Sequence, residues 1–185
     1  GITGISTRAD DFVTEIFTAS THDTILFFSN KGKLYRLRGY EIPEAGRTAK
    51  GTAIVNLLSL DNGEKISAVI PINNFAEGKY LLMATKNGLI KKTALTEYNS
   101  ARKTGLQAIT LKEDDELITV KLTDGEDNVV LVTTGGMCIT FDEKDVRPMG
   151  RTAQGVIGIK LSDDDSVIGM ESVIGGSNTT LLTIT

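Results

Sequence analysis

Hydrophobic residues lie in short, separate runs along this chain, and polar residues and glycine interrupt every run. Valine, isoleucine and threonine dominate the runs, and they favour strands because their branched side chains restrict χ1 in a helix. Each glycine also costs a helix about 1 kcal/mol relative to alanine. The pattern therefore predicts an all-β chain, with at most a turn or two of helix near Leu95 to Ser100.

One pattern of paired runs occurs three times. In each copy an apolar run is followed by Lys-Gly, Asn-Gly or Gly-Gly and then by a second run, over residues 25–36, 80–91 and 129–140. Glycine supplies the positive φ that a tight hairpin turn needs. The three segments are therefore predicted to be β-hairpins.

The same series of features follows each hairpin. A basic loop ends in glycine at Gly51, Gly105 and Gly155, which are 54 and 50 residues apart. A strand, an acidic turn and a closing strand come next. The predicted strands after the loops are Thr52 to Leu58, Leu106 to Leu111 and Val156 to Leu161, and the closing strands are Ile66 to Ile70, Leu117 to Leu122 and Val167 to Val173. Such four-stranded units of about fifty residues are typical of propeller blades.

The repeats define one domain over residues 1–185. Full units are predicted at approximately 22–74, 77–123 and 126–174, with partial units at 1–18 and 178–185. We therefore expect a partial ring of about three blades with a half-blade at each end. Because the chain starts without methionine and stops within a strand pattern, it is interpreted as an excised piece of a longer protein.

Composition favours a globular protein of a reducing compartment. The chain has 185 residues, 40% of them hydrophobic, which is enough to form a core. Its single cysteine, Cys138, lies in an apolar run and is expected to be a buried, inert thiol. The first residues given have neither the basic start nor the apolar middle expected of a signal peptide, and no apolar stretch of about 18 residues occurs. We therefore expect a soluble, cytoplasmic domain without a membrane partner.

The net charge of −4 conceals an uneven distribution. Residues 25–51 carry six basic against two acidic residues, and residues 80–105 carry five against one, whereas residues 129–155 are neutral. Because equivalent positions stack in a repeat fold, these charges are predicted to form one basic stripe, with the acidic turns gathered elsewhere. The alternative is that the charges only solvate the turns.

The sequence contains no recognisable motif for catalysis or metal binding. The only histidine, His22, has no cysteine or histidine partner for zinc. No nucleophile elbow or phosphate-binding glycine loop is present. The acids at residues 163–165 lack the spacing of a calcium loop and are interpreted as a solvated turn. We therefore predict no catalytic residue, no metal ligand and no cofactor within this chain.

Three segments strongly resemble the DNA gyrase A C-terminal domain family. They are residues 40–58, 78–88 and 91–93, and the similarity continues along essentially the whole chain. The resemblance implies a β-pinwheel, a propeller-like ring whose blades exchange strands and whose basic outer rim binds DNA. Of the family's Gln-Arg-Arg-Gly-Gly-Lys-Gly box only the last glycine could be present, as Gly1, and Arg47 to Gly51 are its degenerate counterpart.

The resemblance also implies a function. The chain is expected to be a non-catalytic part of a type IIA topoisomerase that wraps double-stranded DNA, independently of sequence, to support ATP-dependent negative supercoiling. ATP and Mg²⁺ would act elsewhere in an A2B2 assembly of gyrase A and gyrase B subunits, in the bacterial cytoplasm and associated with the nucleoid. The predicted DNA contacts are the basic residues of the first two units: Lys31, Lys33, Arg36, Arg38, Arg47, Lys50, Lys86, Lys91, Lys92, Arg102 and Lys103.

Three alternatives stay open at this point. The A-type subunit of topoisomerase IV is related but lacks the intact box. A propeller that serves as a protein-interaction scaffold would use its charges only for solubility. A hydrolase would need carboxylates that converge at the ring centre, whereas the acids here recur in one turn per unit.

Overall fold

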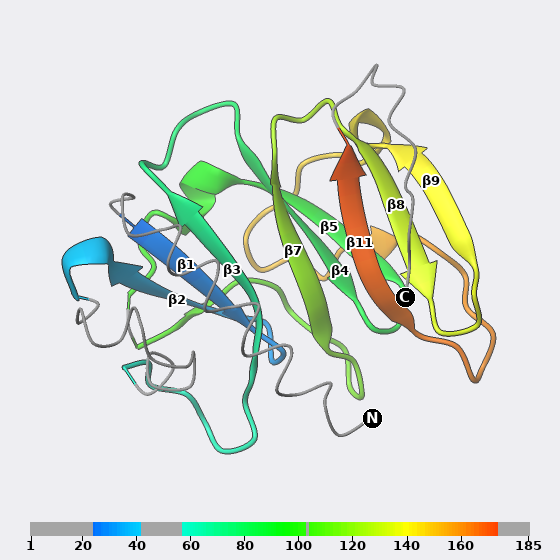
Figure 1. Ribbon diagram of the computed structural model, residues 1–185, viewed down its shortest axis with the longest axis horizontal. Coiled ribbons are helices and arrows are strands. Elements are labelled where there is room, and N and C mark those ends of the chain that lie inside the picture. Colours follow the sequence, from blue (N-terminus) through cyan, green and yellow to red (C-terminus); the bar gives the residue numbers. More distant parts are fainter. Residues whose placement is uncertain (1–23, 42–56, 103, 174–185) are drawn as a thin grey trace.

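Figure 1 shows the computed structural model, which describes residues 24–41, 57–102 and 104–173. In these residues the chain forms strands and short 3-10 helices in the order β1 (Thr24–Ser29), β2 (Lys33–Arg38), η2 (Gly39–Glu41), β3 (Ile66–Ile72), β4 (Tyr80–Thr85), β5 (Leu89–Ala94), η3 (Leu95–Tyr98), β6 (Leu106–Gln107), β7 (Leu117–Thr123), β8 (Asn128–Thr133), β9 (Cys138–Asp142), η4 (Glu143–Asp145), β10 (Val156–Ile157) and β11 (Val167–Val173). The all-β prediction is confirmed, and η3 is the predicted turn of helix. The predicted contacts Arg47, Lys50 and Lys103, and most of the predicted strand from Thr52 to Leu58, lie outside the described residues.

The strands form three antiparallel sheets that share one plan. Their orders are β3-β1-β2-β6, β10-β5-β4-β7 and β11-β8-β9. The hairpin and the closing strand of each sheet come from one repeat, whereas β6 and β10 come from the following repeat. The three predicted hairpins are thus confirmed, and the sheets exchange strands as the resemblance implied.

The strands that follow the basic loops are much shorter than predicted. Among the described residues after these loops, only Leu106–Gln107 and Val156–Ile157 pair as strands, with β2 and β5 respectively. The next backbone N–H groups leave the ladder: those of Ala108 and Ile109 both donate to the carbonyl of Gly32, at 2.8 and 3.3 Å. A sequence repeat therefore does not correspond to one sheet, because each of the first two sheets contains residues from two repeats.

Two apolar layers join the three sheets. Side chains alternate along β1, so that Leu26 and Phe28 face the second sheet while Ile25 and Phe27 pack on the other side, with Leu37. Strand β4 alternates in the same way between the first and third sheets. The runs that form these strands are continuously apolar because both of their faces are buried.

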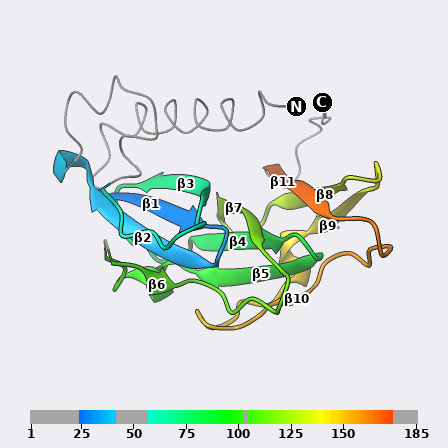
Figure 2. The ribbon, with the colours of Figure 1, turned by 90° about the horizontal axis from the view of Figure 1, so that it is seen from below.

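The inner and outer edges of the sheets differ. β3, β7 and β11 lie side by side, whereas β6 and β10 lie on the opposite side of the molecule, as Figure 2 shows. We call the side with β2, β5, β9 and the short strands β6 and β10 the outer edge. The loops that precede β6 and β10 reach the same side, so the basic residues of these loops lie at the outer edge.

The hairpin glycines are required both for their backbone and for their lack of a side chain. Gly32 and Gly88 have φ of 81° and 95°. A Cβ at Gly88 would lie 2.6 Å from the carbonyl oxygen of Ile159, and one at Gly32 would lie 2.9 Å from that of Ile109. The following repeat therefore packs directly on the hairpin turn.

Replacing Gly88 by alanine should lower the free energy of unfolding by more than the cost of the positive φ alone. A positive φ costs a residue with a side chain roughly 1–2 kcal/mol, and forced overpacking adds roughly 1–3 kcal/mol. Gly78→Ala is the matched control, because Gly78 has φ of 80° with nothing within 4 Å of its Cβ position. Urea unfolding should show the larger loss for Gly88→Ala, and equal losses would contradict the close packing.

Cys138 is exposed, so the prediction of a buried thiol is wrong. It occupies the position of Leu34 in β2 and Ile90 in β5, which pair with Leu106 and Val156 and are buried. Among the described residues β9 has no such covering strand, and its side chains are therefore exposed or half-buried.

Candidate nucleic-acid interface

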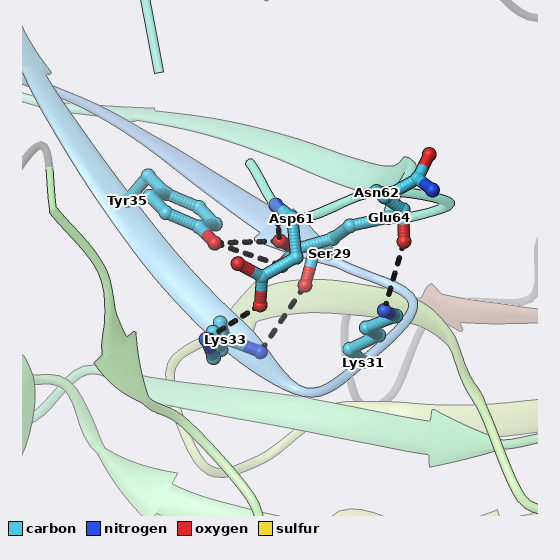
Figure 3. A network of polar contacts seen from close by, with 7 residues as sticks. All are labelled: Ser29, Lys31, Lys33, Tyr35, Asp61, Asn62 and Glu64. Carbon is cyan, nitrogen blue, oxygen red and sulfur yellow. Dashed lines mark hydrogen bonds and ion pairs between the residues drawn. The ribbon is translucent and has the colours of Figure 1, made fainter. Parts of the chain in front are cut away.

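The hairpin turns and the acidic turns lie together, contrary to the prediction that they separate. Lys33 forms an ion pair with Asp61, with 3.1 Å between Nζ and Oδ2, and the Lys31 ammonium donates to the backbone carbonyl of Asn62 at 3.2 Å. Figure 3 shows both lysines against the turn at residues 61–64. The adjacent acidic turn thus partly balances the positive charge of this hairpin. The prediction of one basic stripe, separate from the acidic turns, is wrong here.

One acid in each turn holds the neighbouring strands in place. Glu64 is buried and accepts hydrogen bonds from the Tyr35 hydroxyl and from the backbone N–H of Asp61, each at 2.8 Å. Asp115 accepts from the Asn87 N–H at 2.9 Å, and Asp165 from the Gly135 N–H at 2.8 Å. These acids stabilise turns, which explains why an acidic turn recurs in each repeat.

The pKa values of two groups in these turns reflect the same contacts. Burial, and then the hydrogen bond to Glu64, raise the pKa of the Tyr35 hydroxyl well above its usual range. Hydrogen bonds from the Thr134 hydroxyl and the Gly135 N–H lower the pKa of Asp165 to about 2. At neutral pH the Tyr35 hydroxyl therefore acts as a donor and the Asp165 carboxylate as an acceptor.

Lys91 is buried, so its prediction as a surface contact is wrong. Its ammonium donates to the carbonyl of Ala108 at 2.6 Å and also to the carbonyl of Arg151. The Tyr98 hydroxyl donates to the same Ala108 carbonyl at 2.9 Å. Lys91 thus lies in the second repeat between the residues after β6 and the loop before β10, where no phosphate can reach it.

Lys92 is also buried, and the surface prediction is wrong for it as well. Its ammonium lies 4.6 Å from the centre of the Tyr80 ring and 3.9 Å from Oε2 of Glu143. The Glu143 side chain is fully buried; it accepts from the Thr123 hydroxyl and, at 3.0 Å, from the Asp127 N–H. Burial, and then the charge of Glu143, raise the pKa of Asp127. Lys92 and Glu143 therefore join the second and third sheets.

Three of the predicted residues do converge at the outer edge. Arg36 and Arg38 are two residues apart on β2, so their side chains point to the same face. The backbone N–H of Arg36 donates to the backbone carbonyl of Arg102 at 3.1 Å. We call Arg36, Arg38 and Arg102 the arginine cluster. Burial, and then the charges of Arg38 and Arg102, lower the pKa of Arg36, although an arginine stays charged at neutral pH.

The Arg36 side chain is held in a defined position. Its Nη1 donates to the carbonyl of Asn99 at 3.1 Å, and its guanidinium carbon lies 5.7 Å from the centre of the Phe75 ring. Arg38 is half-buried and Arg102 is exposed. Glu41 lies close by and offsets part of the charge. A planar guanidinium held in this way suits bidentate binding of a phosphate.

Sequence reasoning missed Arg151 as a candidate contact. Its loop precedes β10 as the loop of Arg102 precedes β6, and its Nη1 donates to the Gln107 carbonyl at 2.6 Å. The signal was the repeat register, which places both arginines in the basic loops, but the neutral charge of the third unit obscured it. Lys86 is exposed at the second hairpin turn, apart from the arginine cluster.

No candidate metal centre occurs in the described residues. No group of three or more histidine, cysteine, aspartate or glutamate side chains in this part of the chain could hold a metal ion. The arrangement supports one kind of chemistry, electrostatic binding of an anionic polymer along the outer edge.

Raising the pH should stabilise the fold through Lys91. Burial, and then the charge of Arg151, lower the pKa of its ammonium from 10.5 to about 8. Between these values the unfolded chain holds a proton that the folded chain has released, so Lys91 contributes a rise in the free energy of unfolding of roughly 3 kcal/mol, which the raised pKa of Tyr35 opposes near the upper end of the range. Urea unfolding at both ends of this range should show the rise, and Lys91→Met should abolish it. The matched control Lys112→Met, at an exposed lysine, should keep it.

The fold and the site together define a propeller-like domain, in which strands of the following repeat complete the first two sheets and the arginine cluster lies at the outer edge. A family described as "DNA gyrase C-terminal domain, beta-propeller" matches residues 23–73, 79–124 and 127–174. The chain belongs to this family, which confirms the resemblance and the fold class.

Individual relatives agree with this assignment. The DNA gyrase A subunit of Clostridium acetobutylicum is 56% identical over 158 residues, which are 85% of this chain and 19% of that protein. The solved C-terminal domain of DNA topoisomerase IV is 36% identical with a TM-score of 0.76, over 84% of this chain and 48% of that one. The solved DNA gyrase A C-terminal domain is 29% identical with a TM-score of 0.68, over 83% and 48%. The chain spans about a fifth of the length of the curated relatives that it matches.

Proposed function

We propose that this chain binds duplex DNA along its outer edge and bends it, as the DNA-wrapping part of a gyrase A subunit. The observation that carries the proposal is the arginine cluster, which gathers three guanidinium groups on the exposed outer edge of a gyrase-family domain. Bending 20–30 base pairs costs roughly 1–6 kcal/mol, which several phosphate contacts can offset. Arg151, in the equivalent loop of the next repeat, would extend the same interface, whereas the exposed predicted contacts Lys31 and Lys86 lie at hairpin turns apart from it.

The rest of the proposal concerns the whole protein. The chain would contribute no catalytic residue, and wrapping would support ATP-dependent negative supercoiling by an A2B2 assembly with gyrase B, with ATP and Mg²⁺ bound elsewhere. The place of action would be the bacterial cytoplasm, at the nucleoid. No helix among the described residues is long and apolar enough to cross a membrane.

A second candidate is the equivalent domain of a topoisomerase IV A-type subunit. The higher TM-score and identity of the topoisomerase IV structure favour it. The 56% identity to a gyrase A subunit favours the first candidate. Both candidates share DNA binding at the outer edge, so the same first experiment applies to them.

The binding of the chain to random-sequence duplex DNA should depend steeply on salt. Phosphate contacts release counterions, so that the logarithm of the binding constant falls against the logarithm of salt by about 0.9 per contact. Fluorescence anisotropy over a series of salt concentrations measures this slope. Two unrelated duplexes should bind alike, because phosphate contacts carry no base information. A slope near zero, or no binding at low salt, would favour the scaffold alternative.

A further inference from the structure

Lys91 occupies a position at which the other two hairpins carry no charge. The same position after the turn glycine is Tyr35 in β2 and Ile139 in β9. Burial, and then the charge of Arg151, lower the pKa of the Lys91 ammonium, so its surroundings oppose the charged form. The hairpin itself therefore does not require a lysine here, and the contacts that the ammonium makes explain its presence.

The Lys91 ammonium joins segments of two successive repeats. Its acceptors are the backbone carbonyls of Ala108, at 2.6 Å, and of Arg151. Ala108 follows β6, the covering strand of β2, and Arg151 lies shortly before β10, the covering strand of β5. We call residues 151–153 the Arg151 loop. One buried ammonium thus fixes this loop of the third repeat to the segment that completes the first sheet.

The Arg151 loop binds the second repeat through each of its three backbone carbonyls. The first, that of Arg151, accepts from Lys91. The carbonyl of Thr152 accepts from the Thr110 hydroxyl at 2.6 Å, and that of Ala153 accepts from the Thr110 N–H at 3.3 Å. Hydrogen bonds from a charged donor are roughly twice as strong as those between neutral groups. Lys91 therefore makes the strongest of the three contacts.

The Arg151 guanidinium lies at the same edge as the arginine cluster. Its Nη1 donates to the carbonyl of Gln107, which pairs with Lys33 of β2. Lys33 precedes Arg36 by three residues, which is about 10 Å along a strand. The Arg151 loop thus brings a fourth guanidinium, from the third repeat, to the edge of the first sheet. Like charges at this spacing repel one another, so the loop needs other contacts to hold it there.

We propose that Lys91 is a positioning residue for DNA binding. It fixes the Arg151 loop at the edge of the first sheet, so that the Arg151 guanidinium and the arginine cluster contact one DNA backbone. Lys91 itself does not touch the DNA. A loop that is already fixed loses less conformational freedom when its side chain binds, so releasing the loop should weaken binding. The inference rests on the proposed function and adds a buried residue to the interface.

Trypsin cleavage after Arg151 tests the fixing of the loop without DNA. The carbonyl of the cleaved bond is the one that Lys91 binds, so cleavage requires this contact to open. In the 185-residue chain, Lys91→Met should speed this cleavage at least about tenfold. Mass spectrometry of the fragment that begins at Thr152 measures the rate, with cleavage after the exposed Lys31 as the internal reference.

Thr110→Val gives a second test of the loop that leaves Lys91 in place. The variant removes the hydroxyl that donates to the Thr152 carbonyl and keeps the size of the side chain. It should also speed cleavage after Arg151, by roughly threefold to tenfold, because it removes one neutral hydrogen bond. The role of the loop contacts is therefore measurable even if Lys91→Met does not fold.

Duplex binding tests the consequence for the interface. Lys91→Met should lower the salt slope by about 0.9, the value of one phosphate contact, and weaken binding roughly fivefold at about 0.1 M salt. Arg151→Gln should have the same effect, and a variant with both changes should bind no more weakly than Arg151→Gln. Lys112→Met is the matched control, because it removes the charge of an exposed lysine and should change neither the slope nor the cleavage.

Three results would overturn the positioning role. They are unchanged cleavage after Arg151 in both Lys91→Met and Thr110→Val, faster cleavage with an unchanged salt slope, and additive effects of Lys91→Met and Arg151→Gln on binding. If the unaltered chain bound no duplex at low salt, the proposed function would fail together with this inference. With binding intact, the three results contradict the inference alone.

Discussion

A Glu143→Ala variant is expected to lose about 3–5 kcal/mol of unfolding free energy, because it leaves the buried Lys92 ammonium without its counter-charge. The same change removes the acceptor of the Thr123 hydroxyl and of the Asp127 N–H. The contacts of Glu143 with Lys92 and Thr123 lie between the second and third repeats, so cooperativity between the sheets should fall as well. Urea unfolding followed by far-ultraviolet circular dichroism measures both effects.

Two further variants separate the buried ion pair from a general loss of charge. Glu126 is exposed and lies 4.0 Å from the Lys144 ammonium, so Glu126→Ala should cost about 1 kcal/mol or less. A double variant with Lys92→Met and Glu143→Leu removes both charges and should recover part of the loss. If Glu143→Ala matched Glu126→Ala, the ion pair would not be what joins these sheets.

Reversing the charge of Arg38 and Arg102 together is expected to weaken duplex binding by at least about tenfold and to lower the salt slope by about 1.8, which corresponds to two phosphate contacts. The melting temperature should not change, because both residues lie at the outer edge, where Arg38 is half-buried and Arg102 is exposed. Fluorescence anisotropy and thermal unfolding of the double Arg→Glu variant measure the two properties side by side. A parallel loss of stability and affinity would mean that the arginines are structural.

Lys31→Glu provides the matched control for this prediction. Lys31 is exposed, but it lies against the acidic turn at residues 61–64, where its charge is already partly balanced. Its reversal should change affinity by less than about threefold, since the proposed interface lies at the arginine cluster. An equal effect of Lys31→Glu and the double variant would extend the interface to the hairpin turns.

The hairpins could be predicted from sequence because their signals are local. A turn glycine such as Gly32 or Gly88 requires a positive φ, and the apolar runs on either side require burial. The short covering strands could not be predicted in the same way. Leu106–Gln107 pairs with residues of another repeat, and nothing local limits it to two residues.

The candidate site was predictable only in part, because charge in the sequence does not report where a side chain points. Lys91 and Lys92 belong to a basic segment, yet both ammonium groups are bound by acceptors from the third repeat. The arginine cluster was within reach of sequence reasoning, since Arg36, Arg38 and Arg102 lie in the segments that it marked as basic. The acids of the turns were predicted to lie apart from the hairpins, but their carboxylates stabilise the hairpin turns themselves.

The exchange of strands between repeats has a consequence for synthesis on the ribosome. The first hairpin ends at Arg38, but its covering strand ends at Gln107, 69 residues later. At about 5–20 residues per second, the growing chain holds the β2 edge open for roughly 3–14 s. During this interval the nascent first sheet presents an unpaired strand to its neighbours on the same messenger, so codons that slow translation between Arg38 and Gln107 should favour misassembly.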